Sequence, residues 1–369
     1  MSTPAVHKEP VLRIAKRDGL PRWKAWLIRV AAVVLALILS GAFIYAITRL
    51  NPVQVYEAMF EGAFGSQRRS WVTVRDAMML LCIGIGLAPA FKMKFWNIGA
   101  EGQILVGGCM TAGLMLALGG TVPTPVLLAV MAIASLCAGA VWGMIPAVFK
   151  ARWGTNETLF TLMMNYVAIQ ITSYCVALWE NPYGSNVVGV INQSTKDGWF
   201  PELFGQAYGL NVLIVAVLTV GMYIYLKSSK QGYEIAVVGE SQNTARYAGI
   251  RLSKVFIRTM AISGAICGLA GFIAVAGASH TISTSTAGGR GFTAIIVAWL
   301  AKFNTFVMVL ISFLLVFLQK GASQIASQFK LNEFASNVIT GIILFCIIGS
   351  EFFIQYKLIF RGRKEAHHT

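Results

Sequence analysis

Ten apolar runs separated by shorter polar segments constrain this chain to fold within a lipid bilayer. Only 12% of its 369 residues are charged and 56% are hydrophobic, whereas a soluble domain has about 25% charged residues. A transmembrane helix needs about 20 consecutive apolar residues. The runs are Trp26–Ile47, Ala77–Phe91, Ala100–Leu118, Pro125–Val148, Thr158–Leu178, Leu210–Tyr225, Val255–Ala276, Gly291–Ala301, Thr305–Leu318 and Ser336–Tyr356. We therefore expect an all-α polytopic membrane protein with about ten transmembrane helices.

Four of these runs are shorter than a full span, and they end at Phe91, Tyr225, Ala301 and Leu318. Short helices flanked by glycine are typical of membrane proteins in which half-helices border a pathway. We therefore expect short, broken or strongly shielded helices among the ten.

A polar turn, Phe95–Gln103, follows the second run and leads into the third, and it contains one glycine before its carboxylate and one after it. Backbone groups that are not paired within a helix cannot face lipid, because no water is present to pair with them. The turn must therefore line a cavity or be buried in protein. Such a turn indicates a protein with an internal pathway rather than a simple membrane anchor.

The distribution of positive charge predicts the orientation of the chain. The net charge is +15, and the positive-inside rule places most Lys and Arg residues in the cytoplasm. With the N-terminus inside, the outer segments hold only eight of the 30 basic residues: Arg49, Arg68, Arg69, Arg75, Lys196, Arg290, Lys320 and Lys330. Both termini are therefore expected in the cytoplasm, which requires an even number of spans. No basic stripe with interleaved aromatic residues is present, so a nucleic-acid partner is not expected.

The expected organisation is one transmembrane domain over residues 26–356 between two cytoplasmic tails, 1–25 and 357–369. An external loop rich in Pro, Gly, Asn and aromatic residues covers 179–209, and a basic cytoplasmic loop covers 226–254. The N-terminal apolar run has 22 residues, longer than the ~7–15 of a signal peptide. We therefore expect an uncleaved first span.

No residue pattern in the sequence indicates an enzyme. The six cysteines are scattered through apolar runs without a C-x-x-C pair, and His280 has no second ligand at metal-binding spacing. No P-loop motif for ATP, nucleophile elbow or H-E-x-x-H motif occurs. We therefore expect no catalytic residue, metal or cofactor in this chain.

Polar residues at the predicted helix starts are the first candidates for function, because ionisable groups at membrane depth are rarely incidental. Asn97 lies just before the third run and Glu101 in its first turn. Asn156 and Glu157 lie just before the fifth run. We favour helix capping and compensation of the helix dipole for these residues, with substrate contact as the alternative. Asn165 lies mid-helix, where a hydrogen bond between helices is favoured over a ligand contact.

A second polar stretch, Ile282–Phe292, contains Ser, Thr and three glycines and leads into the short run at Gly291. Its glycines permit close backbone packing at the mouth of a half-helix. Arg290 either binds an anionic partner or extends its charged end to the membrane interface, and the second is favoured.

The cytoplasmic loop contains a segment suited to contact with another protein. Ala245, Ala248 and Gly249 are small residues on a predicted short helix that would let it sit closely in a groove, and Gly239 is expected to open a turn before it. The alternative is an ordinary solvated helix.

Together these residues resemble the permease subunits of bacterial ABC importers, in the branch that includes nucleoside and simple-sugar permeases. The resemblance covers nearly all of the chain from the first span. It is carried by Asn97–Gln103, by Asn156-Glu157 with Leu162–Tyr166, by Gly239-Glu240 with Ala245–Ile250, and by Gly291–Ala298.

The resemblance implies a ten-helix fold like that of the vitamin B12 importer permease, in the bacterial plasma (inner) membrane. It implies three protein partners: an ABC ATPase, a second permease and an external substrate-binding lipoprotein. ATP would be hydrolysed on the ATPase. The implied coupling residues are Gln242, Asn243, Ala245, Arg246, Tyr247, Ala248 and Gly249, and the implied pathway-supporting residues are Asn97, Glu101, Gln103, Asn156, Glu157, Asn165 and Arg290.

The substrate is expected to be a nucleoside first and a monosaccharide second. The alternatives are an ABC permease for branched-chain amino acids and an ion-coupled secondary transporter. A secondary transporter would need an ion-coupling site near the bilayer midplane, and the carboxylates lie instead at predicted helix starts.

Overall fold

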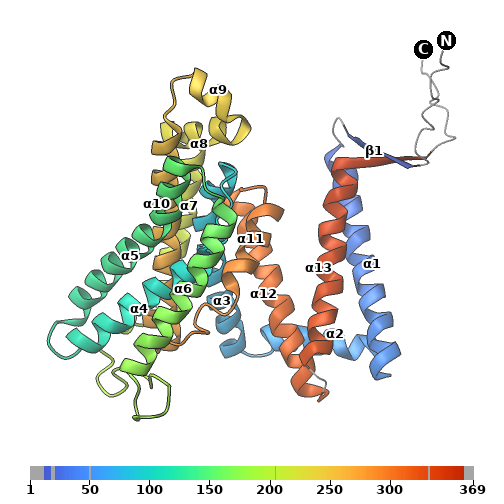
Figure 1. Cartoon of the computed structure of the whole chain (residues 1–369). Coiled ribbons are helices and arrows are strands. Elements are labelled where there is room, and N and C mark those ends of the chain that lie inside the picture. Colours follow the sequence, from blue (N-terminus) through green and yellow to red (C-terminus); the bar gives the residue numbers. More distant parts are fainter. Residues whose placement is uncertain (1–11, 18–20, 50, 204, 331–332, 361–369) are drawn as a thin grey trace. The chain divides into compact units, whose positions relative to one another are not determined.

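The computed structural model describes residues 12–17, 21–49, 51–203, 205–330 and 333–360, and helices predominate among them (Figure 1). These residues belong to two compact units, Ser66–Val316 and the combination of Met1–Gly65 with Phe317–Thr369. The larger unit contains α3 (Gln67–Lys92), α4 (Ala100–Leu118), α5 (Thr124–Trp153), α6 (Glu157–Leu178), α7 (Gly209–Ser228), α8 (Lys230–Glu240), α9 (Gln242–Tyr247), α10 (Leu252–Ala274) with its π-helical end η1 (Val275–Ser279), α11 (Arg290–Leu300) and the first part of α12 (Thr305–Gln328). The smaller unit contains β1 (Leu12–Lys16), α1 (Arg22–Thr48), α2 (Pro52–Phe64), the end of α12, α13 (Glu333–Gln355) and β2 (Tyr356–Phe360).

Each of the ten apolar runs lies in a helix, apart from Ala301 just after α11 and Tyr356 at the start of β2, so the largely helical membrane class predicted from the sequence is confirmed. Within the described residues, seven helices are long and apolar enough to cross a membrane: α3, α4, α5, α6, α7, α10 with η1, and α12. The apolar parts of α1, α11 and α13 are shorter, at Val30–Ala46, Arg290–Leu300 and Val338–Ile354.

The prediction of short, broken or strongly shielded helices is confirmed at two of its four positions, since α11 is short and α3 is 83% buried, and it is wrong for α7 and α12. The runs ending at Phe91, Tyr225 and Leu318 belong to helices of 26, 20 and 24 residues. The helices continue beyond the apolar residues; α3, for example, begins with polar residues after Ser66, whose side chain accepts a hydrogen bond from the Arg69 amide. Only α11, with 11 residues, is a half-helix.

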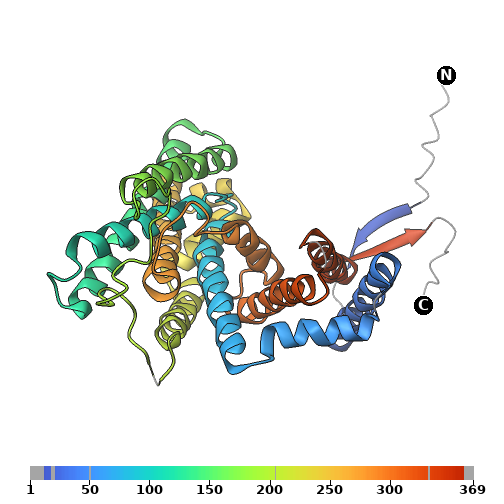
Figure 2. The same ribbon diagram turned by 90° about the horizontal axis from the view of Figure 1, so that it is seen from below.

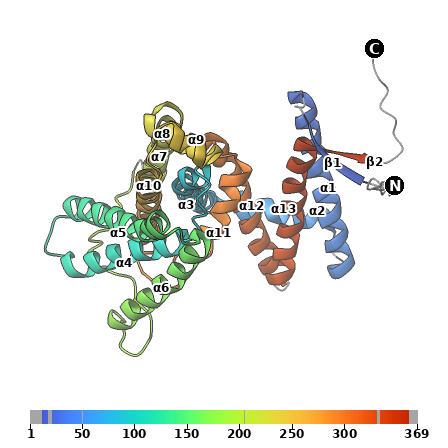
Figure 3. The same ribbon diagram turned by 45° about the horizontal axis from the view of Figure 1, so that its top comes forward.

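The core of the larger unit is formed by α3 and α10. In each of these helices, 83% of the most apolar 18-residue stretch is buried. Figure 3 shows α3 enclosed by neighbouring helices, and α10 packs along α4 and α5. α8 and α9 form one end of this unit, and the loop between α6 and α7 lies at the opposite end (Figure 1).

Glycines allow α10 to cross its neighbours at backbone distance. A Cβ atom built on Gly264 of α10 would lie 2.2 Å from the carbonyl oxygen of Gly139 in α5, and one on Gly139 would lie 2.2 Å from the carbonyl oxygen of Gly264. On the α4 side, a Cβ on Gly107 would lie 2.3 Å from the Gly268 carbonyl oxygen. Small residues at helix crossings are the usual means of tight packing in membranes, where the hydrophobic effect adds little between helices.

In the smaller unit, α1 packs against α13 and the two strands form an antiparallel pair. Leu12 pairs with Phe360 and Lys16 with Tyr356, which places the start of α1 and the end of α13 on the same side of this unit (Figure 2). Parts of the predicted tails, 12–16 and 357–360, are therefore strands; residues 1–11 and 361–369 lie outside the described residues.

The structure also corrects the prediction for Gly239. This residue does not open a turn; it lies inside α8, where a Cβ atom would be 2.1 Å from the Lys92 carbonyl oxygen. The glycine is needed for close contact with the end of α3. The helices α2 and α8 were not predicted, because both are short and neither is apolar throughout.

We expect Gly264→Ala to destabilise the protein by about 1–3 kcal/mol, because the added methyl overfills the crossing of α10 with α5. Thermal unfolding of the purified protein in detergent measures the effect as a lowered Tm. Gly221→Ala is the matched control, since Gly221 lies in α7 with nothing within 4 Å of an added Cβ. An equal Tm for the two variants would contradict the packing argument.

Candidate functional site: a carboxylate-capped half-helix beside a polar cavity

The polar turn before α4 is buried in protein, as its backbone chemistry requires. The Asn97 side chain is fully buried, and its Oδ1 accepts hydrogen bonds from the Gly99 amide at 3.0 Å and from Gln103 Nε2 at 3.3 Å. Its Nδ2 donates to Ser263 Oγ of α10 at 3.1 Å. The prediction that Asn97 caps α4 is wrong: the N-cap is Gly99, which makes no side-chain hydrogen bond. The amide instead stabilises the turn from inside and joins it to α10.

Residues of α6 pair with the remaining backbone groups of this turn. Asn165 Oδ1 accepts from the Gly102 amide and its Nδ2 donates to the Ile98 carbonyl, both at 2.9 Å. Thr161 Oγ1 accepts from the Ile98 amide at 3.2 Å. The prediction that Asn165 hydrogen-bonds between helices is therefore confirmed.

Glu101 acts on a different helix from the one that contains it. It lies in the first turn of α4, where a carboxylate compensates the helix dipole. Its two oxygens, however, accept hydrogen bonds from the amides of Gly289 at 2.6 Å and Gly291 at 2.8 Å, at the start of α11. Gly291 must be glycine, because a Cβ atom there would lie 2.7 Å from a Glu101 oxygen. One buried carboxylate thus joins the N-termini of α4 and α11.

The other end of α11 contacts the same turn through aromatic rings. Trp299 stacks on Trp96 with centroids 5.4 Å apart, and Phe91 meets both indoles edge-on. The half-helix is therefore held to residues 96–101 near both of its ends. Its position is determined by this polar turn and not by an apolar face alone.

The second pair of predicted residues lies at the start of α6. Asn156 is the N-cap, with Oδ1 accepting from the Leu159 amide at 3.2 Å, and Glu157 forms a 2.8 Å ion pair with Lys150 at the end of α5. Within the described residues, neither side chain has a hydrogen bond or ion pair with α11. Together they fix the α5–α6 connection.

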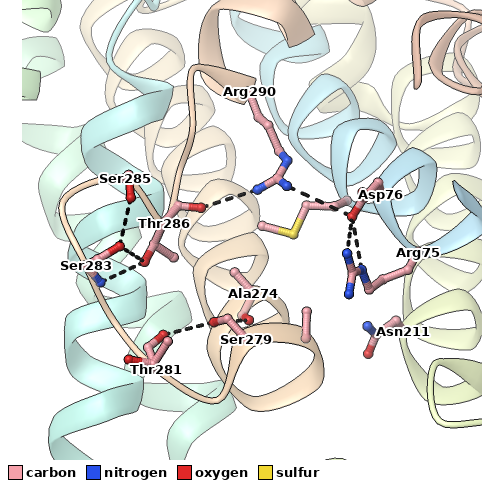
Figure 4. Close-up of a pocket in the computed structure, with 12 residues that line it drawn as sticks. Arg75, Asp76, Asn211, Ala274, Ser279, Thr281, Ser283, Ser285, Thr286 and Arg290 are labelled. Atoms are coloured by element: carbon pink, nitrogen blue, oxygen red, sulfur yellow. Dashed lines mark hydrogen bonds and ion pairs between the residues drawn. The ribbon is translucent and has the colours of Figure 1, made fainter. Parts of the chain in front are cut away.

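A polar cavity of about 270 Å³ lies beside the start of α11, and Figure 4 shows the residues that line it. The segment 276–281, part of which lines the cavity, is hydrogen-bonded to the α6–α7 loop. Arg75 and Asp76 from α3 line it, with Arg290 from α11. The other lining residues are Met79, Asn211, Ala274, Ala278, Ser279, Thr281, Ser283, Ser285 and Thr286. The sequence singled out Arg290 and the hydroxyl-rich stretch. It did not indicate Arg75, Asp76 or Asn211, whose only signal is a charged or amide group at the edge of an apolar run.

The charges in the cavity are arranged around Asp76. Arg75 contacts Asp76 Oδ1 through Nε at 3.0 Å and Nη2 at 2.9 Å, and its guanidinium lies over the Tyr208 ring. Arg290 Nη2 is 4.0 Å from the same oxygen, and Arg290 Nη1 donates to the Thr286 carbonyl at 3.3 Å. Two guanidinium groups therefore face one carboxylate, which leaves one net positive charge among these three side chains.

The loop between α6 and α7 is fixed to the end of α10. The amides of Ile191 and Phe200 donate to the carbonyls of His280 and Ala276. Trp199 stacks on the His280 ring, with centroids 3.7 Å apart. Burial lowers the pKa of His280 below its ordinary value, so the imidazole is neutral at pH 7.

The predicted coupling segment forms the short helix α9 and its C-terminal turn. Ser241 caps it by accepting from the Thr244 amide at 3.2 Å, and Ala245 is the one fully buried residue, facing its own chain. The other predicted residues are exposed: Gln242, Asn243, Arg246, Tyr247, Ala248 and Gly249. The segment thus presents a protruding surface, with Tyr247 93% exposed.

A basic cavity of about 740 Å³ lies at the base of α9, lined by the end of α5 and the start of α10. Its cations are Lys150, Arg246, Arg251 and Lys254. Lys150 pairs with Glu157, and the other three cations keep this surface positive. Across the described residues, no group of three or more His, Cys, Asp or Glu side chains is placed to hold a metal ion.

We expect Glu101→Gln to loosen the N-terminus of α11. A glutamine has one side-chain oxygen, so one of the two glycine amides would lose its hydrogen bond to a charged acceptor, and such a bond contributes about 1.5–3 kcal/mol. Ala287 is fully buried just before this helix. Ala287→Cys places a thiol there, and the same chain without this cysteine gives the background rate of maleimide labelling. The thiol should react roughly tenfold faster or more when Glu101→Gln is also present. Glu157→Gln is the control, and an unchanged rate in Glu101→Gln would contradict the capping role.

Comparison with known proteins agrees with this architecture. Residues 72–348 match the model of a family described as the permease component of the branched-chain amino acid transport system. The guanosine ABC transporter permease NupP of Bacillus subtilis is 31% identical over 90% of this chain and 95% of its own length. The glucose ABC transporter permease TsgB13 of Haloferax volcanii is 28% identical over 94% and 93%, and the nucleoside ABC transporter permease NupB of Lactococcus lactis is 27% identical over 90% and 93%. No solved structure shows significant similarity to the chain. The chain therefore belongs to the family of branched-chain amino acid transport system permease components.

Proposed function

We propose that this chain is the transmembrane permease subunit of an ATP-driven importer for a nucleoside or a simple sugar. The observation that carries the proposal is the similarity, over at least 90% of both chains, to permeases named for guanosine, nucleosides and glucose. A nucleoside is the first candidate, because two of these three relatives are named for nucleoside substrates. The alternative of a branched-chain amino acid rests on the family description alone.

Energy for transport is proposed to come from a separate ATPase subunit, because the sequence contains no P-loop. A second permease, identical or homologous, would complete the pathway, and an external lipoprotein would deliver the substrate. The carboxylates argue against ion coupling, since Glu101, Glu157 and Asp76 already bind backbone amides or basic side chains. A secondary transporter would need a carboxylate available to exchange ions.

The proposed topology has ten spans, as in the vitamin B12 importer permease, with both termini in the cytoplasm of a bacterial cell. Its support is that all ten apolar runs lie in helices and that the start of α1 and the end of α13 share one side of their unit. The basic residues around α9 supply the positive charge expected inside. The α6–α7 loop at the opposite end of the unit would then face outward.

We propose α9 and its C-terminal turn as the surface that binds the ATPase. The buried Ala245 packs against the rest of the chain. Arg246, Tyr247 and Ala248 are exposed, and Arg246 also lines the basic cavity. A protruding, positively charged surface favours a partner groove with acidic residues. Movement of the ATPase would reach α10 through the turn 248–251.

Reconstitution tests the function directly. With its ATPase and binding protein, the permease should accumulate guanosine, uridine or glucose in proteoliposomes when ATP is present on the ATPase side. The purified chain alone should accumulate none of them under any imposed ion gradient. Gradient-driven uptake by the chain alone would assign it to secondary transport instead.

We expect Ala248→Trp to separate the ATPase from the permease, because packed interfaces tolerate an added bulky side chain poorly, at about 1–3 kcal/mol or more. Transport and substrate-stimulated ATP hydrolysis should fall together, and less ATPase should co-purify. Ala207→Trp is the matched control, since Ala207 is an exposed alanine in the α6–α7 loop. Wild-type uptake and association in Ala248→Trp would exclude α9 as the coupling element.

Two tyrosines at opposite ends of the larger unit test the orientation. Tyr183 in the α6–α7 loop is 96% exposed and Tyr247 is 93% exposed. In intact cells, a membrane-impermeant maleimide should label Tyr183→Cys and not Tyr247→Cys, and inverted vesicles should show the reverse. Labelling of Tyr247→Cys in intact cells would reverse the topology.

A further inference from the structure

We propose that the polar cavity between α3, α7, η1 and α11 binds the adjacent hydroxyl groups of a sugar ring, either a free sugar or the ribose of a nucleoside. This inference rests on the proposed function, and it places the recognition of the substrate class within a single permease chain. It is carried by the complementary donors and acceptors that the cavity presents together (Figure 4).

The hydroxyl side chains of the loop before α11 leave a donor for a ligand. Ser283 Oγ lies 3.0 Å from Ser285 Oγ and 3.3 Å from Thr286 Oγ1. Three hydroxyl hydrogens are therefore available for two hydroxyl–hydroxyl bonds. Whichever way these two bonds are directed, one of the three O–H groups remains free to donate to a ligand. Ser285 is exposed and lines the cavity, so this end of the row of hydroxyls is accessible.

The charged residues supply both kinds of partner on the facing wall. Asp76 is an acceptor held rigidly by Arg75, with two contacts of 3.0 and 2.9 Å to one oxygen. Arg290 adds guanidinium N–H donors, only one of which is used by the Thr286 carbonyl. A carboxylate beside guanidinium donors fits a pair of neighbouring hydroxyls, because each hydroxyl both donates and accepts.

Asn211 adds a buried amide to the wall of the cavity. Its side chain is fully buried at the cavity wall, and Nδ2 donates to the Gly277 carbonyl at 3.0 Å. Its Oδ1 has no partner in the described part of the chain. This oxygen is itself buried and lies against Gly277, so the amide forms part of the polar wall without reaching a ligand. The net positive charge of the three charged side chains would also attract an anion such as phosphate, so the experiment below includes phosphate as a comparison ligand.

The composition of the cavity favours a sugar ring over a nucleobase, and its size admits either. Its volume of about 270 Å³ lies just below the ~300–1,000 Å³ of typical small-molecule sites. None of the described residues that line it is aromatic, so a base would have no ring on which to stack. In a nucleoside, the base would therefore extend out of the cavity.

Thiol protection tests the site independently of transport. Ala278 lines the cavity through its methyl group alone, so Ala278→Cys places a thiol there without removing a polar group. Thr284→Cys is the matched control, an exposed position in the neighbouring loop that does not line the cavity. Both are labelled with a maleimide in the permease–ATPase complex, without the binding protein, in the presence of guanosine, 2′,3′-dideoxyguanosine, glucose or inorganic phosphate.

Guanosine or glucose should slow the labelling of Ala278→Cys at least threefold, and dideoxyguanosine, which lacks both hydroxyls, should not. Thr284→Cys should be unaffected by all four compounds. Protection by glucose alone would assign a free sugar, and protection by guanosine a nucleoside. Equal protection by guanosine and dideoxyguanosine, protection by phosphate alone, or no protection would overturn the proposal.

A second variant tests the role of Arg290. Arg290→Lys on the Ala278→Cys background keeps the charge but removes the planar pair of donors. It should raise the half-protecting concentration of guanosine or glucose by about tenfold. An unchanged concentration would exclude Arg290 from the site. Because uptake by the wild-type complex is measured separately, loss of protection with intact ATP-driven uptake would refute only this site, and absence of uptake would refute the proposed function.

Discussion

The hydrogen bonds between the Glu101 carboxylate and the amides of Gly289 and Gly291 connect the parts of this protein on which its function would depend. The N-terminus of α11 has unpaired amides and a partial positive charge, neither of which is stable at membrane depth without a partner. The carboxylate pairs with these amides and is in turn stabilised by the dipole of its own helix, α4. Arg290 lies between the two bonded glycines, so the same interaction fixes the position of the arginine in the cavity wall.

Helix crossings at glycine give the polar groups around this carboxylate a fixed framework. α10 approaches α5 at Gly139 and Gly264, and α4 at Gly107 and Gly268, so closely that no Cβ would fit. Backbones in direct contact cannot shift without losing many short contacts. The buried amides of Asn97 and Asn165 then join the turn before α4 to α10 and α6.

The larger unit separates two kinds of chemistry between its ends. The hydroxyl-rich cavity lies toward the α6–α7 loop, and the exposed, basic surface of α9 lies at the opposite end. α10 connects the two ends: its first residues line the basic cavity, and η1 at its other end lies beside the polar cavity. In the proposed permease, a change at the ATPase would reach the substrate region along this one buried helix.

The sequence alone determined the membrane class, the ten helical segments and the burial of the turn at 95–103, because each follows from local hydropathy or from backbone groups that lipid cannot satisfy. It identified Asn156 as a helix cap and Asn165 as a residue that hydrogen-bonds to another helix. Both roles follow from the position of the residue, at the start or in the middle of a predicted helix. Only the tertiary structure decided which helix Glu101 stabilises, because its partners are nearly 190 residues away in the chain. The same holds for Asn97, which also joins the turn to Ser263 of α10, and for Gly239, which contacts Lys92 rather than opening a turn. Arg75, Asp76 and Asn211 have no local pattern that marks them, and they line one cavity only because α3 and α7 pack together. Contacts between distant segments depend on the packing of whole helices, and the hydropathy of one segment carries no information about its neighbours.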